Sequence, residues 1–469
     1  MSDAAEVPAA ELPHPALPPE QPAAPQVRPW DVLPKDVVPP PATLIEDRSN
    51  WVPEVKPIDL TRYTSPEFHK LEVERMWSRT WQFAVWDGDI PNPGDIYVYR
   101  NVGRSVLVVR QRDGSVKAFV NSCLHRGREL CSEKTHQSQL RCPYHAFTWG
   151  LEGDLKWIPS QWDYPQIEKD KFSLPEVRVE QWNGFWFVNF DPAAPSLDEY
   201  LGDMVDHWKA WDWSDRYRSV TVARKLNCNW KAALDAFIET LHVYASHPEA
   251  AYLTPDSATQ YDTWPDQPHF SRFHSIVGWA SANLDPEPSQ QEVLDSYTSV
   301  YLPEMFGTPE GDLQEGEGAR EALRRIAVDV YRDRMGVDVS QMPNSELLDG
   351  TEYMIFPNFI IWPSTANPLV YRFRPGNGPD ECLWETSLYL QYQGERPAPG
   401  PVYELEVGEP MRDIPELGYV GPILQQDCDN LEFMQDGMKA SVTGEANVAR
   451  YQESRLRHYH ETLGKYVAD

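Results

Sequence analysis

The stretch NSCLHRGRELCSEKTHQSQLRCPYHAFTWG, residues 121–150, contains two short pairs of soft metal ligands. One residue separates Cys123 from His125, and two residues separate Cys142 from His145. Each pair offers one thiolate and one imidazole. The stretch therefore predicts a metal centre that takes two sulfur and two nitrogen ligands from two separate loops.

Three kinds of metal centre compete for this pattern. A structural zinc ion accepts two sulfurs and two nitrogens, but zinc modules favour paired cysteines followed by paired histidines. An all-cysteine [2Fe-2S] cluster needs two more cysteines at plant-type spacing, and none is nearby. In a Rieske [2Fe-2S] centre, one iron takes two cysteines and the other takes two histidines, which explains the mixture directly. We therefore expect Cys123 and Cys142 on one iron and His125 and His145 on the other, with zinc as the alternative.

Short β-rich runs surround these two loops. Residues 95–102, 105–111 and 116–122 have the composition of strands, and Asp113-Gly114 marks a tight hairpin between the last two. The run GFWFVNF, residues 184–190, precedes Asp191-Pro192, where we expect a boundary. The pattern predicts a small antiparallel β domain over residues 81–191, with the Cys/His pairs on its loops.

The second half of the chain is expected to form an α+β domain over residues 192–469, with an antiparallel sheet covered by helices. Apolar residues recur at helical spacing in 229–250 and 317–336. Strand-like runs follow at 353–363, 369–375 and 381–393.

Three segments flank these domains or interrupt them. Residues 1–45 hold 12 of the 43 prolines and lack apolar periodicity, so we expect a flexible arm. Residues 46–80 are expected to be a helical segment that packs on the larger domain. Residues 281–316, rich in Pro, Glu, Gln and Gly, are predicted to be a mobile insertion.

Composition excludes several classes of partner. The 469 residues, 41% of them hydrophobic, suffice for two domains. A net charge of −30 disfavours binding to nucleic acid or to anionic membranes. No apolar run approaches the roughly 20 residues that span a bilayer, so a cytoplasmic location is the default expectation. Six cysteines in so long a chain make a poor disulfide framework and favour metal binding in a reducing compartment.

A second metal site is indicated near residue 240. In a helix over 229–245, Asp235, Glu239 and His242 share one polar strip, and Pro248 ends the helix so that His247 can converge on His242. Two histidines and a carboxylate form the facial triad of non-heme Fe(II) oxygenases. The carboxylate is either Glu239 or a residue far along the chain, and a solvated polar face is the alternative interpretation.

Together these motifs resemble the Rieske non-heme iron oxygenases, the α subunits of the aromatic ring-hydroxylating oxygenase family, over about residues 46–455. In that family the motif includes Arg126 and Gly127, and Trp149 resembles its packing aromatic residue. The Asp/Glu-x-x-His-x-x-x-x-His pattern matches Glu239, His242 and His247, with the acid serving as a bridge between metal sites. Many members have Asp where this chain has Glu239.

The resemblance places the third iron ligand in ILQQDCDNLEFMQDG, residues 423–437. Asp427 is the preferred residue, and Asp429 is the runner-up. The resemblance also indicates a substrate pocket, and its expected wall residues are Asp235, Met354, Phe356, Phe359 and Ile361. Asp235, one turn before Glu239, is also expected to line the iron site, and these two acids are the expected catalytic residues. Plain core packing is the alternative for each of these.

The resemblance implies a terminal oxygenase that hydroxylates an aromatic or other apolar compound with O₂. Its cofactors would be a Rieske [2Fe-2S] cluster and a mononuclear Fe(II), and its electrons would come from an external reductase, with or without a ferredoxin. A homotrimer or a multiple of it is expected, with or without a small β subunit. The alternatives are an electron carrier without oxygenase activity and a monooxygenase that demethylates quaternary amines.

The cluster-binding segment is locally basic. Arg126, Arg128, Lys134 and Arg141 lie within an otherwise acidic chain. We expect these residues to help dock an acidic electron donor, with ordinary solvated side chains as the alternative.

Overall fold

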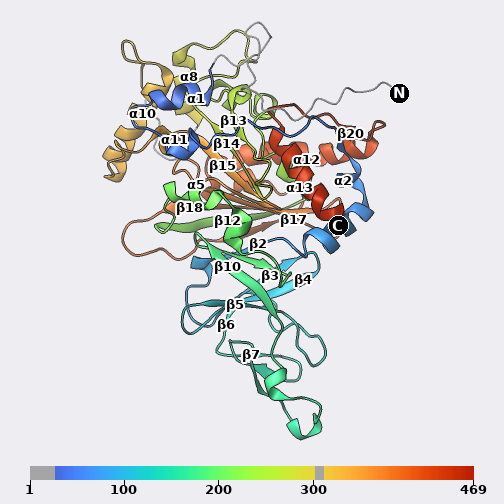
Figure 1. The fold of residues 1–469 in the computed structure, drawn as a ribbon. Helices are drawn as coiled ribbons and strands as arrows, with labels where there is room; N and C mark the ends of the chain where they lie inside the picture. The colour runs from blue at the N-terminus through green and yellow to red at the C-terminus, as the bar shows by residue number, and fades with distance from the viewer. Residues whose placement is uncertain (1–26, 301–310, 469) are drawn as a thin grey trace.

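The computed structural model describes residues 27–300 and 311–468. Figure 1 shows a small β domain at one end of the molecule and a larger domain of sheet and helices at the other. The expected fold class, a small antiparallel β domain joined to an α+β domain, is confirmed. No helix in the described ranges combines the length and the apolar composition needed to cross a membrane.

The small domain is built on a seven-stranded antiparallel sheet in the order β2-β11-β10-β5-β4-β3-β6. A three-stranded sheet, β7-β8-β9, lies beyond it. The strands are β2 (Gln82–Trp86), β3 (Asp95–Asn101), β4 (Arg104–Arg110), β5 (Val116–Val120), β6 (Thr135–His136), β7 (Leu140–Arg141), β8 (Thr148–Trp149), β9 (Leu155–Trp157), β10 (Glu176–Trp182) and β11 (Phe185–Asn189). The predicted hairpin joins β4 to β5, where Gly114 has a φ of +86°.

The larger domain is built on an eight-stranded sheet in the order β13-β14-β15-β16-β17-β18-β12-β19. Only the β12–β19 pairing is parallel. The strands are β12 (Arg216–Leu226), β13 (Gln260–Asp262), β14 (Phe270–Ser275), β15 (Gly350–Ile355), β16 (Phe359–Ile361), β17 (Leu369–Pro375), β18 (Cys382–Gln391) and β19 (Val402–Leu405). A separate pair joins β1 (Ile58–Asp59) to β20 (Glu445–Ala446).

Helices cover this sheet and extend beyond it. They are α1 (Pro29–Val32), α2 (Thr61–Thr64), α3 (Pro66–Leu71), α4 (Leu197–Leu201), α5 (Met204–His207), α6 (Trp230–Asp235), α7 (Val243–Ser246), α8 (Gln290–Val300), α10 (Ala319–Val330), α11 (Asn344–Leu347), α12 (Val420–Ala440) and α13 (Ser454–Ala468). Short turns of π-helix extend α3 and α10 over Glu72–Met76 and Tyr331–Met335.

Each face of the large sheet has its own core. On one face, Met354, Phe356 and Ile360 pack with residues of α6, α12 and α13. On the other face, Phe359 and Ile361 pack against aromatic residues of the small domain. This division follows from the alternation of side chains along β15 and β16. The sheet is therefore enclosed by helices on one side and by the small domain on the other.

Two segments differ from expectation. Of the predicted flexible arm, residues 27–45 are packed on the larger domain: Leu33 and Leu44 are fully buried, and the Asp36 carboxylate accepts from Arg320 at 2.7 Å. Residues 1–26 lie outside the described ranges. The predicted mobile insertion contains α8, whose Val293 and Leu294 are buried against α10. Both segments are rich in proline, so their sequences did not indicate that Leu33, Leu44, Val293 and Leu294 would be buried.

Candidate metal centres and cavity

The two Cys/His pairs lie on two loops with matching turns. In the loop after β5, the Gly127 N–H donates to the Cys123 carbonyl at 2.8 Å, and Gly127 has a φ of +78°. In the loop between β7 and β8, the Ala146 N–H donates to the Cys142 carbonyl at 3.0 Å, and Ala146 also has a positive φ, +62°. Each turn folds back so that its cysteine and histidine face the same side.

The two loops bring their ligand side chains together. The His125 and His145 rings lie 4.6 Å apart between centroids, and both thiols are buried. Burial, with further contributions from neighbours including Cys142, raises the pKa of the Cys123 thiol. The Nδ1 atom of His125 is buried without a hydrogen-bond partner in the described chain. An unpartnered imidazole nitrogen beside two thiols has the chemistry of a metal ligand.

Aromatic packing supports this site from behind. Phe147 stacks on His125 with centroids 4.6 Å apart and an interplanar angle of 8°. Trp149 is fully buried, and its indole N–H donates to the Phe172 carbonyl at 3.0 Å. Arg126 is exposed and lies over the Tyr144 ring at 5.4 Å. Trp149 is thus packed behind the cluster loops, next to Phe147.

A single zinc ion does not fit these four donors. Four ligands around one zinc ion, with bonds of about 2.0 to 2.3 Å, lie within about 4 Å of one another. Across the described ranges, only one group of three or more His, Cys, Asp or Glu donors gathers within 4.8 Å, and it is elsewhere in the chain. The donors of the two loops are therefore spread more widely, as two irons require.

That other group consists of His242, His247 and Asp427. The Asp427 Oδ1 lies 3.1 Å from the His247 Nε2 and 3.6 Å from the His242 Nε2. Asp427 is buried on α12, whereas Asp429 is exposed and accepts from the Gln425 amide at 2.7 Å. Of the two candidate carboxylates, the fold brings only Asp427 to the histidines.

The prediction of one continuous helix through this region was wrong. Helix α6 ends at Asp235 and α7 begins at Val243, so Leu241 and Tyr244 are exposed instead of sharing a buried face. The Glu239 carboxylate accepts from the backbone N–H groups of Leu241 and His242. Local side-chain bonds of this kind compete with helical ones. The break lets His242 and His247 converge.

Both histidines are oriented by a partner on their other ring nitrogen. His242 Nδ1 lies 2.6 Å from the Glu239 Oε1, and His247 Nδ1 lies 2.6 Å from the Gln426 Oε1. Burial lowers the pKa of His242, but Glu239 and then Asp427 outweigh this and raise it to about 9. With Nδ1 held in this way, each histidine presents Nε2 toward Asp427.

Asp235 does not lie in the wall of the cavity. Its carboxylate accepts from the Tyr63 hydroxyl at 2.6 Å and lies 3.3 Å from the His460 Nε2. Tyr63 belongs to α2 and His460 to α13, so Asp235 joins three elements of the core. Its expected role at the iron is replaced by a buried structural one.

A cavity of about 210 Å³ opens beside the triad. Its wall is mostly apolar and comes from residues 236–250, here called the iron loop, and from α8, α10, β14, β17 and α12. The expected wall residues Met354, Phe356, Phe359 and Ile361 are absent from it, because they are buried in the two cores on either side of the sheet. Sequence reasoning missed the residues that do line it, among them Phe237, Tyr331, Trp362, Leu369 and Tyr371.

Two protein-family models match this chain. The model of the ring-hydroxylating α subunit catalytic domain matches residues 205–469, and that of the Rieske [2Fe-2S] domain matches residues 80–168. The chain belongs to the family of ring-hydroxylating α subunits. It therefore combines a Rieske [2Fe-2S] domain with a catalytic domain of the class that binds mononuclear iron.

Curated relatives of this chain include two kinds of enzyme. Chlorobenzene dioxygenase subunit alpha of Cupriavidus sp. (strain PS12) is 34% identical over 187 residues, 37% of this chain and 40% of that protein. Carnitine monooxygenase oxygenase subunit of Escherichia coli (strain K12) is 29% identical over 300 residues, 58% of this chain and 79% of that protein. The matched region thus spans less than half of the chlorobenzene dioxygenase subunit.

Solved structures share the fold. A quaternary ammonium Rieske monooxygenase superposes with a TM-score of 0.63 at 17% identity, covering 88% of this chain and 96% of that one. Naphthalene 1,2-dioxygenase from Rhodococcus sp., bound to indole, superposes with a TM-score of 0.60 at 20% identity, covering 88% and 94%.

Proposed function

We propose that this chain is a terminal oxygenase that uses O₂ and electrons from an external reductase to hydroxylate an aromatic or other apolar compound. The observation that carries the proposal is the His242, His247 and Asp427 triad beside an apolar cavity, in a chain that also holds the two Cys/His loops. When bound, the cluster supplies single electrons and the ferrous iron supplies open positions for O₂.

Seven side chains are proposed as metal ligands. Cys123 and Cys142 would hold one iron of the cluster and His125 and His145 the other, while His242, His247 and Asp427 would hold the mononuclear iron. The support is the buried, unpartnered Nδ1 of His125 and the convergence of three donors within 4.8 Å. Glu239 and Gln426 keep the Nε2 atoms of the two triad histidines directed at the metal position.

The two metal positions within one chain lie far apart in the fold. Figure 1 places β7, which leads into the second cluster loop, toward the end of the molecule opposite to α12. Exposed aromatic residues lie on the small domain, including Trp162 at 82% exposure, and Phe433 on α12 is 78% exposed. We infer a head-to-tail homotrimer, or a multiple of it, in which the cluster of one copy faces the triad of the next.

In such an assembly, Glu239 is the acid that would bridge the two sites. It already contacts His242 and is buried beside the cavity. Its other contact would be His145 of the adjacent copy. A Glu239→Gln variant that keeps both metals should turn over much more slowly than wild type, and a wild-type rate would rule out the bridging role.

The electron donor is proposed to be acidic. Arg126, Arg128, Lys134 and Arg141 are all exposed around the cluster loops. Lys134 has one weak contact, 3.9 Å to the Asp89 carboxylate. Charge reversal at Arg128 and Lys134 should slow reduction of the cluster at low salt more than at high salt, because steering of this kind is screened. An unchanged rate of cluster reduction at low salt would refute the proposal that the donor docks on these basic residues.

A second candidate function is oxidative demethylation of a quaternary amine. The observation in its favour is the pair of aromatic rings, Phe237 and Trp362, in the cavity wall, since such rings attract quaternary ammonium groups. One experiment separates the two functions: ¹⁸O₂ turnover with a surrogate reductase against a panel of aromatic compounds and quaternary amines. Labelled hydroxyl groups on an aromatic product support the main proposal, and release of formaldehyde from an amine supports the second.

A further inference from the structure

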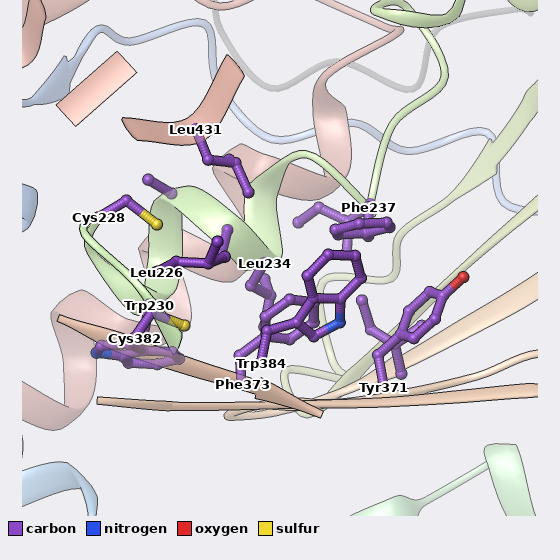
Figure 2. Packing of buried hydrophobic residues seen from close by; sticks show 14 of the residues in the cluster. Leu226, Cys228, Trp230, Leu234, Phe237, Tyr371, Phe373, Cys382, Trp384 and Leu431 are labelled. Atoms are coloured by element: carbon purple, nitrogen blue, oxygen red, sulfur yellow. The ribbon is translucent and has the colours of Figure 1, made fainter. Parts of the chain in front are cut away.

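The hydroxyl of Tyr371 lies in the cavity wall and points away from the core in which the Tyr371 ring packs. Tyr371 lies on β17 two residues after Leu369, so both side chains fall on the face that borders the cavity. The Tyr371 ring packs against Phe237 and Trp384, with centroids 4.9 Å and 5.9 Å away. Figure 2 shows the hydroxyl oxygen directed away from these packed side chains.

The Tyr371 hydroxyl has no partner within the described chain. Tyr371 is only 3% exposed, and no hydrogen bond of its hydroxyl is found among the described residues. Burial, and then the charges of Asp427 and Glu352, raise the pKa of Tyr371 well above its usual value. The hydroxyl therefore keeps its proton and is available as a donor. A buried donor of this kind normally has an acceptor, which the cavity's occupant can supply.

The charges around the cavity favour an uncharged occupant. None of the described residues that line it is Lys or Arg, so a carboxylate would be buried without a counter-charge. The acidic lining residues are Glu239 and Asp427. A divalent metal ion on the triad would neutralise these two negative charges, which leaves little net attraction for an ammonium group.

We propose that Tyr371 is a specificity-determining residue whose hydroxyl donates a hydrogen bond to one uncharged oxygen of an aromatic substrate. The substrate class is an aromatic ring that carries an ether, hydroxyl or carbonyl oxygen. This inference rests on the proposed function, because it places that ring beside His242, His247 and Asp427. The cavity volume of about 210 Å³ accommodates a substituted ring, since a cavity of about 150 Å³ binds benzene.

Anchoring one oxygen has a consequence for regiochemistry. A plain hydrocarbon could rotate in an apolar cavity, whereas a ring held at its oxygen presents fixed carbon atoms to the triad. Tyr371 would therefore decide which carbon is attacked. The Tyr371 ring packs against Phe237, which itself belongs to the iron loop, so Tyr371 is held beside that loop.

The test uses two ligands that differ by one atom. Anisole and ethylbenzene are of similar size, but an ether oxygen in the first replaces a methylene group in the second. Dissociation constants are measured by calorimetry on the metal-loaded, full-length protein without O₂, so that no turnover occurs. Tyr371→Phe should weaken anisole binding about tenfold, the equivalent of one hydrogen bond of about 1.4 kcal/mol, and leave ethylbenzene binding within about twofold.

The matched control is Tyr419→Phe. Tyr419 lines the same cavity, but its hydroxyl already donates to the Ala366 carbonyl at 3.5 Å. Removing this oxygen should change the affinities for anisole and ethylbenzene to the same extent. Iron is counted on every sample, so that an altered metal site cannot be mistaken for a lost hydrogen bond.

Several results would overturn the inference. They are an equal loss for both ligands in Tyr371→Phe, unchanged anisole affinity in that variant, or no anisole binding to the fully loaded wild-type protein. Tighter binding of benzoate or of phenyltrimethylammonium than of anisole would also overturn it. Absence of the mononuclear iron from the wild-type protein would instead refute the proposed function, so the two failures are distinguishable.

Discussion

Substitution of Gln426 by Ala tests how the triad is oriented. Gln426 lies next to Asp427 on α12, and its Oε1 lies 2.6 Å from the His247 Nδ1. Its amide nitrogen donates to the Glu249 carboxylate at 2.9 Å, which fixes the amide so that oxygen faces the histidine. The variant removes this acceptor without adding or removing charge at the site.

The expected effect is on iron affinity. His247 is 4% exposed, so its Nδ1–H would lose its partner in a place that solvent hardly reaches. An unsatisfied buried donor costs about 1 to 3 kcal/mol, and loss of a partner behind a metal ligand lowers metal affinity about 10- to 100-fold. Competition with a chromogenic Fe(II) chelator, in the absence of O₂, measures this affinity, while sulfide content reports the cluster separately.

Two further variants control this experiment. Glu249→Gln leaves an oxygen that can still accept from the Gln426 amide, so Gln426 stays oriented and the variant should retain most of the affinity. Asp429→Asn changes an exposed carboxylate on the same helix and should leave iron binding unchanged. If Gln426→Ala bound iron as tightly as wild type while His247→Ala did not, the orienting role of Gln426 would be refuted.

Three other predictions concern stability. Lys231→Met leaves the fully buried Glu72 without its partner at 2.7 Å and should cost about 3 to 5 kcal/mol in chemical denaturation. Phe359→Ala removes a ring packed 5.0 Å from Phe83 and should cost about 3 to 5 kcal/mol without changing ligand binding in the cavity. Burial raises the pKa of Glu346 to about 8, so folding favours its protonated form. The contribution of Glu346 to folding stability is then fully present below about pH 4.3, the pKa of an unfolded glutamate, and is lost as the pH rises through 8. The Tm should therefore fall over this pH range, and Glu346→Gln should flatten the decline.

Each of these predictions has a result that contradicts it. If a Glu72→Leu, Lys231→Met double variant is no more stable than Lys231→Met, the stability lost in Lys231→Met does not come from leaving the Glu72 charge unpaired. Weaker anisole binding in Phe359→Ala would indicate that Phe359 lines the cavity after all. A wild-type Tm that rises between pH 5 and pH 8, unchanged by Glu346→Gln, would place the titration elsewhere.

The cluster domain was predictable because its signal is local. Cys123 and His125, and likewise Cys142 and His145, are so close in sequence that one turn brings each pair together. The strands around them alternate clearly, and the turn at Asp113-Gly114 has a specific residue requirement. Local spacing and local turn chemistry therefore sufficed for the fold of this domain and for its candidate ligands.

The cavity was not predictable because its wall is built from distant segments. Met354 and Phe359 were expected there from alternation alone, but both faces of the sheet are buried, so alternation does not say which face borders the cavity. Tyr371 shares its strand face with Leu369, and only the placement of the iron loop over β17 turns that face into a wall.

The iron loop shows a third case, in which the site was indicated for a partly mistaken reason. His242 and His247 were expected to converge where a helix ends before Pro248. In the structure the helix ends earlier, because Glu239 bonds to backbone N–H groups that a helix would use. The hydrogen bonds of such a side chain compete with the backbone hydrogen bonds of a helix, and the surrounding packing decides which set forms.

Iron and acid-labile sulfide analysis of the purified full-length protein tests the central claim most directly. The account predicts about three irons and about two sulfides per chain, the sum of a [2Fe-2S] cluster and one mononuclear iron. Asp427→Ala should lower the iron to about two with sulfide unchanged. About two irons in wild type would indicate an electron carrier without the oxygenase site, and zinc without sulfide would contradict the cluster itself.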